Sequence, residues 1–162
     1  DFLLHSTREY VVKDYHIWMP NSFDDTIIQP CDKIKKQYEI GFCGNYVNRK
    51  PLLDWLSEEY GIKLDIFVIG DDMVNAINSY KCHFNMNMNW NKDSASDSDE
   101  YRHLGFIDGV NCLIYRSIKE MREKIDFVMN NDVEYISKAG FQLSKKHSYN
   151  KRVENLLEEI KI

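Results

Sequence analysis

Residues 38–56, "YEIGFCGNYVNRKPLLDWL", decide the predicted fold. The tyrosine-rich apolar run at its start predicts a strand over residues 38–43, and the helical spacing of the apolar side chains after it predicts a helix over residues 50–60. Pro51 suits the first turn of that helix, and Gly61 suits its end. The stretch therefore predicts a strand, a tight turn and a helix.

The next segments extend this unit into a sheet. The sequence "KLDIFVIG", residues 63–70, is nearly continuously apolar, which is typical of a strand covered on both faces. A short helix is predicted over residues 72–80, and a further strand over residues 81–87. Because strands alternate with helices, we expect an α/β fold, a Rossmann-like parallel sheet with helices on both faces.

The last third of the chain is predicted to be helical. Ser117 and Glu120 have the spacing of a capping box, and Asp132 and Ser148 can begin two further helices. Apolar residues recur at helical spacing in all three and are expected to face a core. They are Ile118, Met121, Ile125, Val128, Val133, Ile136, Leu143, Val153, Leu156, Leu157 and Ile160.

Composition bounds the function. A chain of 162 residues, 43% of them hydrophobic, can bury one substantial core. Its net charge of −5 argues against non-specific binding to nucleic acid or to anionic membranes. No apolar run is long enough to predict a transmembrane segment. Since the first residue is Asp1, we expect a fragment or a processed chain.

The four cysteines lie far apart and have no Cys-x-x-Cys spacing. Two of them, Cys43 and Cys82, fall inside apolar runs that predict strands. This pattern indicates reduced, buried thiols in a cytoplasmic protein, and it gives no sign of a structural zinc site or of another metal.

The turn at residues 44–50, "GNYVNRK", is a candidate binding site. Ligands of open parallel sheets bind beyond the carboxyl ends of strands, where the strand order reverses. Backbone N–H groups at Gly44 and Asn45 can approach an anion closely, and Arg49 and Lys50 supply mobile positive charge. Alternatively, Gly41 and Gly44 only allow close packing of strand and helix. The turn has neither a dinucleotide fingerprint nor a Walker motif.

A second unusual stretch follows the third predicted strand. Asn85, Asn87, Asn89 and Asn91 alternate with apolar residues, which places their amides on one face of an extended segment. Such amides can bind sugar hydroxyls or a phosphate, or can instead satisfy the loop backbone. The acidic residues 93–100, "DSASDSDE", are expected to form a mobile, solvated loop.

The order of these motifs resembles a known family. Along with residues 38–56, the stretches "HSTREYVVKDY", "IWMPNSFD", "YKCHFNMN" and the tail from "FIDGVNCLIYR" to "SYNKRVENLL" carry the resemblance. The chain looks like the carboxyl-terminal part of a GT-B glycosyltransferase, of the group that includes the CgeB-like spore-maturation proteins. The likeness covers nearly the whole chain.

The resemblance implies two parts. Residues 1–37 would be the remnant of a first domain with its linker, and residues 38–162 the Rossmann-like domain that binds the donor, ending in a helical tail. The last helix, which follows His147, would cross back towards residues 1–30.

The resemblance also implies a function, namely transfer of a sugar from a nucleotide-sugar donor to an unknown acceptor, without a metal or another cofactor. The general base normally comes from the other domain of such enzymes, so no catalytic residue is named. The residues expected at the donor site are Gly44, Asn45, Arg49, Gly70, Asn85, Arg102 and His147.

One departure from the family pattern matters. In the family, an arginine and the glutamate of a Phe-Glu-Ala helix bind the donor diphosphate and ribose. Here residues 99–102 run directly into residues 103–111, so Arg102 can stand for the arginine but nothing stands for the glutamate. Either a segment between Arg102 and Gly105 is missing from the numbering, or the protein has lost it. We favour the first alternative, because removing a strand and a helix from a parallel sheet would expose the apolar faces of the elements that remain.

Loss of that segment would make the protein a non-enzymatic binding or structural module with a degenerate transferase fold. A flavodoxin-like or receiver-like domain is a third alternative, and the paired glycines and asparagine-rich strand end fit it poorly. Titration with nucleoside diphosphates separates the enzyme from the module.

Overall fold

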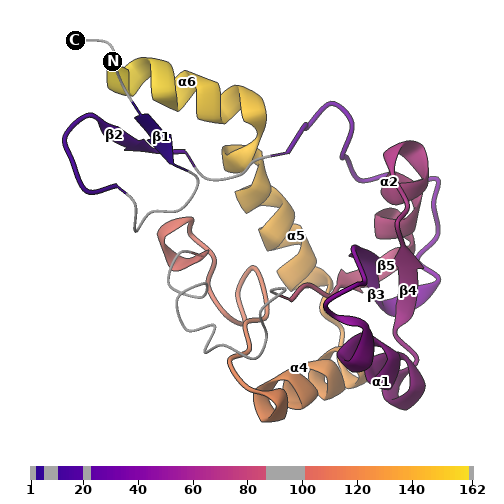
Figure 1. Cartoon of the computed structure of the whole chain (residues 1–162). Helices are drawn as coiled ribbons and strands as arrows, with labels where there is room; N and C mark the ends of the chain where they lie inside the picture. The colour runs from indigo at the N-terminus through magenta and orange to yellow at the C-terminus, as the bar shows by residue number, and fades with distance from the viewer. Residues whose placement is uncertain (1–2, 6–10, 20–22, 87–100, 161–162) are drawn as a thin grey trace. The chain divides into compact units, whose positions relative to one another are not determined.

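A computed structural model describes most of the chain as two compact units. The described residues are 3–5, 11–19, 23–86 and 101–160. The larger unit is Gln29–Gly140, and the smaller one combines Asp1–Ile28 with Phe141–Ile162. Figure 1 labels the elements of both.

The larger unit is built on a three-stranded parallel sheet. Its strands are β3 (Tyr38–Gly44), β4 (Lys63–Ile66) and β5 (Tyr80–His83), and they lie in the order β4-β3-β5. Gly44 pairs with Ile66 on one side of β3, and Ile40 pairs with Cys82 on the other. The predicted α/β class with a parallel sheet is confirmed.

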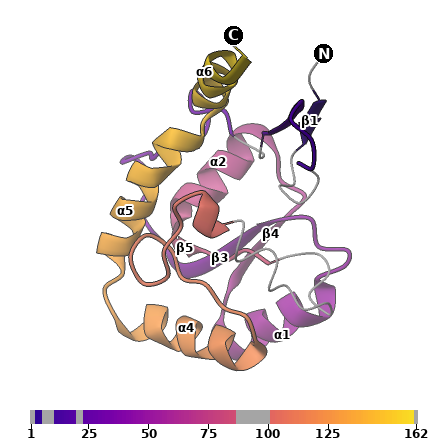
Figure 2. The ribbon, with the colours of Figure 1, turned by 90° about the vertical axis from the view of Figure 1, so that its left-hand side faces the viewer.

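Helices lie on both faces of this sheet. Helix α2 (Gly70–Ser79) packs against β3 and β5 on one face, and α1 (Lys50–Tyr60) and α4 (Ile118–Asn130) cover the other, as Figures 1 and 2 show. Helix α5 (Glu134–Ser144) follows α4. The core therefore lies mainly between β3 and the two helices α1 and α4.

Alternating side chains of β3 begin this core. Ile40 and Phe42 are 4% and 1% exposed, and they meet apolar residues of the two covering helices. The helix residues in this cluster are Leu52, Leu53, Leu56, Met121, Ile125 and Val128, joined by Val133 and Ile136 at the start of α5. Burial of these stripes, as predicted, is what holds α1 and α4 on the sheet.

Local signals set the helix ends as predicted. Helix α1 carries a proline in its first turn and ends at Gly61, which has a left-handed φ of 66° and donates its N–H to Ser57 O. Ser117 Oγ accepts the N–H of Glu120, and the Glu120 carboxylate accepts the N–H of Arg116, so that both side chains cap α4.

The prediction for residues 63–70 was wrong in part. Strand β4 ends at Ile66 and lies at an edge of the sheet, and it is not a central strand covered on both faces. Phe67 and Ile69 are 63% and 81% exposed. An apolar run by itself cannot distinguish a buried strand from a strand that continues into an exposed apolar loop.

The smaller unit pairs the two ends of the chain. Strands β1 (Leu3–His5) and β2 (His16–Trp18) form a parallel pair, and the short 3-10 helix η2 (Lys145–His147) leads into α6 (Tyr149–Ile160). Phe23 pairs with Ser148, and Tyr149 N–H donates to Phe23 O at 3.0 Å. The predicted return of the last helix to residues 1–30 is confirmed.

Two expectations about buried side chains, one in α6 and one in α4, were wrong. Val153 and Leu157 of α6 are 46% and 47% exposed, and Ile118 is 48% exposed. Ile118 is the first residue of α4, where a side chain projects beyond the core, and two strands of three residues offer α6 little surface to cover.

Candidate functional site

The carboxyl edge of β3 and β5 has the geometry of a ligand site in a parallel sheet. From β3 the chain leaves through α1 to β4 on one side, whereas β5 lies on the other side of β3. Loops that leave neighbouring parallel strands in opposite directions open a crevice at the carboxyl edge. The residues that follow β3 and β5, from Asn45 and from Phe84 onward, lie there.

Asn45 shapes the turn after β3. Its side-chain Oδ1 accepts the N–H of Val47 at 2.9 Å, and Arg49 N–H donates to Tyr46 O at 3.0 Å. An asparagine that binds the backbone two residues ahead stabilises a tight turn. The side-chain oxygen of Asn45 is therefore used within the protein, and what remains for a ligand is the turn backbone and the Asn45 amide nitrogen.

Arg49 is folded back over this turn. Its Nη1 donates to Asn45 O at 3.1 Å, and its guanidinium carbon lies 5.6 Å from the centre of the Phe42 ring. The Nε atom is buried and has no hydrogen-bond partner among the described residues. A buried cationic donor without an acceptor is costly, and an anion at this edge would remove that cost.

The two glycines of the turn have steric explanations. A Cβ at Gly44 would lie 3.3 Å from the Phe42 ring and 3.9 Å from Arg49 Nη1, so the glycine leaves room for that stack. A Cβ at Gly41 would lie 2.3 Å from the ring of Tyr80, which covers the strand there. Close packing against Tyr80 fully explains the glycine at position 41. At position 44, the absence of a Cβ leaves space for the Arg49 side chain over the Phe42 ring.

Tyr115, which the sequence did not single out, joins the same edge. Its hydroxyl donates to Asn85 O at 2.8 Å, and its ring stacks on Phe84 with centroids 5.8 Å apart. Burial raises the pKa of Tyr115, the neighbouring Tyr101 raises it further, and the charge of nearby Arg49 opposes both. The hydroxyl therefore stays protonated at neutral pH and can donate a hydrogen bond.

Asn85 is held by this contact at the end of β5. Its side-chain Oδ1 accepts the N–H of Met86 at 2.9 Å, and the residue is exposed. The other asparagines of the alternating run, and the acidic stretch 93–100, lie outside the described residues. Tyr115 directly follows the apolar residues 112–114, and that position is the signal in the sequence by which it could have been noticed. Only the packing of the folded chain shows that it contacts Asn85.

The helix N-termini at this edge differ in charge. Helix α1 has no side-chain cap and no acidic residue in its first turn, whereas α2 carries Asp71 and Asp72 there. The positive end of the α1 dipole is therefore open to an anion, and that of α2 is already compensated. Lys50 adds little free charge, because its ammonium pairs with Asp54 at 2.5 Å.

The remaining predicted site residues belong to other elements of the chain. Gly70 is the first residue of α2 and has a φ of 58°. Arg102 is exposed in a helical turn over residues 101–103. His147 belongs to the smaller unit, where its Nδ1 lies 2.5 Å from Arg152 Nη2. Of the predicted site residues, the structure brings Gly44, Asn45, Arg49 and Asn85 to the sheet edge that follows β3 and β5.

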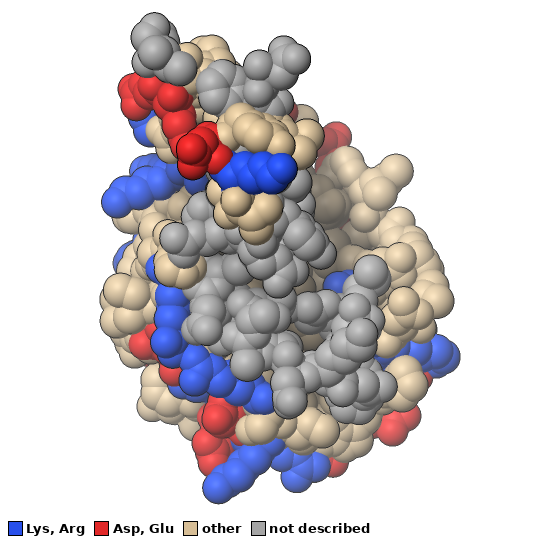
Figure 3. Space-filling view, turned by 60° about the vertical axis from the view of Figure 1, so that its left-hand side comes forward, with Lys and Arg blue, Asp and Glu red and all other residues tan. Residues whose placement is uncertain are grey.

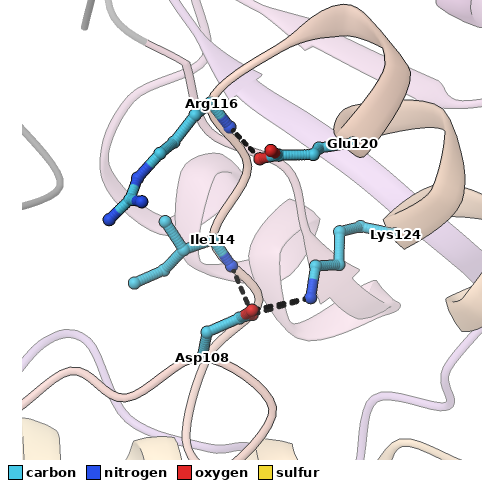
Figure 4. A network of polar contacts seen from close by, with 5 residues as sticks. All are labelled: Asp108, Ile114, Arg116, Glu120 and Lys124. Atoms are coloured by element: carbon cyan, nitrogen blue, oxygen red, sulfur yellow. Dashed lines mark hydrogen bonds and ion pairs between the residues drawn. The ribbon is translucent and has the colours of Figure 1, made fainter. Parts of the chain in front are cut away.

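A polar network holds the loop that leads to Tyr115 (Figure 4). Asp108 accepts the N–H of Ile114 at 2.9 Å and pairs with Lys124 of α4 at 2.7 Å. Partial burial would raise the pKa of Asp108, but Lys124 and the backbone donors outweigh it and lower that pKa. Figure 4 also shows the guanidinium of Arg116 pointing away from both carboxylates of the network. The network fixes the start and end of the loop relative to α4.

Charges of both signs are mixed on one face of the molecule, and two of the thiols are held in the protonated form. Figure 3 shows lysine and arginine side chains interspersed with acidic ones on the face in view. All four cysteines are free and half-buried. Burial and Asp65 raise the pKa of Cys43, and burial with Asp108 raises that of Cys112 to about 11, so both stay protonated.

Two further kinds of feature are absent from the described part of the chain. It contains no cluster of His, Cys, Asp and Glu side chains that could hold a metal ion. None of its helices combines the length and the apolar character needed to cross a membrane.

Comparison with known proteins adds no identification. No protein-family model matches the chain, and no curated protein or solved structure matches it either.

Proposed function

We propose that this chain is the donor-binding half of a glycosyltransferase, a Rossmann-like domain that binds the diphosphate of a nucleotide sugar at the carboxyl edge of β3 and β5. The observation that carries the proposal is Arg49, whose guanidinium is held over the turn after β3 with a buried Nε that has no partner among the described residues. The order of motifs in the sequence supports the same function.

The surroundings of Arg49 suit a diphosphate. The open N-terminus of α1 adds the positive end of a helix dipole, and backbone N–H groups of the turn can approach an oxygen closely. The hydroxyl of Tyr115 lies near Arg49, but its one proton is donated to Asn85 O, so it is not counted as a donor to the ligand. Arg49, the α1 N-terminus and the turn backbone place donors and one full positive charge around a single edge.

The chemistry of sugar transfer explains why such an edge would matter. As the bond between sugar and diphosphate breaks, negative charge grows on the departing phosphate oxygens while the sugar gains oxocarbenium character. Arg49 and the α1 dipole would stabilise the leaving group electrostatically. No residue of this chain is assigned as general base.

A binding or structural module remains the second candidate. Two contacts favour it, because each engages within the protein a group that a donor site could use. The side-chain oxygen of Asn45 accepts the N–H of Val47, and the ammonium of Lys50 pairs with Asp54. A site with one arginine and a turn backbone has less charge than a diphosphate carries, which fits a donor site that has been partly lost. This module would retain the fold and bind no nucleoside diphosphate.

Calorimetric titration of the full chain with uridine and guanosine diphosphate tests the proposal. A charge-assisted hydrogen bond contributes about 1.5–3 kcal/mol, so Arg49→Ala should weaken binding about tenfold or more. Arg49→Lys should recover part of the loss, because it keeps the charge but not the fixed donor geometry.

Arg122→Ala is the matched control. Arg122 also packs on an aromatic ring, with its guanidinium carbon 4.8 Å from the centre of the Trp55 ring, but it lies on α4. Its loss should leave affinity unchanged. If Arg49→Ala lowers the melting temperature and leaves affinity as it was, Arg49 is a packing residue. If the unmodified chain binds no diphosphate, the module is favoured instead.

A further inference from the structure

Phe67 is a strained and exposed aromatic residue at the same sheet edge. Its φ is 58°, and it is the only residue other than glycine with a positive φ in the described part of the chain. The side chain is nevertheless 63% exposed, so burial of the ring does not compensate for the strain. Bulky residues held in this conformation are found at functional sites more often than in ordinary loops.

Phe67 lies next to the turn that carries Arg49. It follows Ile66, which pairs with Gly44, and its N–H donates to Gly44 O at 3.4 Å. Adjacent strands lie about 5 Å apart, so the loop after β4 begins one strand spacing from the loop after β3. The strained residue and the proposed diphosphate site thus belong to one continuous edge.

Charge along this edge gives a bound nucleotide a direction. Asp71 and Asp72, in the first turn of α2, would repel phosphate but can accept hydrogen bonds from ribose hydroxyls. The N-terminus of α1 has no acidic residue in its first turn. A nucleotide would therefore place its phosphates beside α1 and its nucleoside end over the loop between β4 and α2.

We propose that Phe67 is the stacking platform for the base of the nucleotide. This inference rests on the proposed function, since it takes the diphosphate to lie beside Arg49. An exposed ring offers a flat apolar face, and every base has a π face to lay on it without sequence-specific hydrogen bonds. The left-handed backbone at Phe67 ends the strand and leaves the ring at the sheet edge. In a regular strand the side chain at this position would stand perpendicular to the sheet.

Titration of the full chain with uridine diphosphate, guanosine diphosphate and inorganic pyrophosphate tests this. Phe67→Ala and Phe67→Gly should each weaken binding of both nucleotides by about tenfold, the loss expected when one stacked base loses its ring. Phe67→Trp should retain it. Pyrophosphate has no base, so its affinity should not change in any of these variants.

Phe67→Gly also separates the ring from the strain. Glycine adopts the same φ freely, so this variant should melt at or above the temperature of the unmodified chain and still lose nucleotide affinity. Ile69→Ala is the matched control, because Ile69 is an exposed apolar residue of the same loop, 81% accessible. Its loss should leave all three affinities unchanged.

The outcomes that overturn the inference differ from those that overturn the proposed function. If pyrophosphate and both nucleotides bind, and Phe67→Ala changes none of them, Phe67 is not a platform although the diphosphate site stands. If Phe67→Ala weakens pyrophosphate as much as the nucleotides, the residue only shapes the loop. If pyrophosphate and nucleotides fail to bind the unmodified chain, the diphosphate site itself is wrong.

Discussion

Replacement of Gly41 by alanine would test the packing that places β3 and β5. A Cβ at this position would lie 2.3 Å from two carbons of the Tyr80 ring, whereas carbon atoms in good contact lie about 3.5–4.0 Å apart. The ring would have to move by more than about 1 Å. It has little room to do so, because Tyr80 is 2% exposed and its hydroxyl donates to Asp65.

The cost follows from these contacts. Overpacking of a filled core costs about 1–3 kcal/mol, and disturbing a hydrogen bond to a carboxylate costs about 1.5–3 kcal/mol when it is lost entirely. We expect Gly41→Ala to lower the free energy of unfolding by about 2–3 kcal/mol. Urea denaturation followed by circular dichroism should show a midpoint lower by about 1 M or more.

A double-mutant cycle with Tyr80→Leu isolates the clash. Without the ring, Gly41→Ala should change stability by less than about 0.5 kcal/mol, giving a large coupling between the two positions. Gly70→Ala is the control: its Cβ meets nothing within 4 Å, so its cost comes only from the positive φ and should not depend on Tyr80. An equal cost of Gly41→Ala in both backgrounds would refute the packing argument.

Three further predictions concern single groups. Asp108→Asn should cost about 1 kcal/mol at neutral pH. The pKa of Asp108 is lower in the folded state than in the unfolded state, so its contribution to stability is full above the unfolded-state pKa and is lost as the pH falls through the folded-state pKa. The unmodified chain and the variant should therefore become equally stable in acid. A difference in stability that stays constant down to acidic pH would contradict this. Ser117→Ala should cost about 0.5–2 kcal/mol in thermal unfolding, and Ser117→Asp should restore most of it. Alkylation of Cys112, followed by mass spectrometry, should be slow at pH 7 and should reach half of its maximal rate at a pH of about 11; a half-maximal rate near pH 9.0 would show an unshifted thiol.

Local patterns in the sequence determined most elements of the larger unit. The strand from Tyr38, the helix Lys50–Tyr60 and the cap at Ser117 follow from signals within a few residues: apolar periodicity, a proline in the first turn, a glycine that tolerates positive φ, and a serine facing an N–H group. Their physical causes act over one or two turns of chain, so the sequence alone reveals them.

Only the tertiary structure decided what lies next to what. It showed that Tyr115 meets Asn85 across 30 residues of sequence, and that the apolar run after Lys63 leaves the sheet at an exposed Phe67. It also showed that Gly41 makes room for a ring 39 positions later in the chain. Such contacts depend on strand order and on the direction of each side chain, which arise when the sheet assembles. An amphipathic pattern gives only the tendency to be buried, and whether a partner surface exists to bury it is a property of the whole fold.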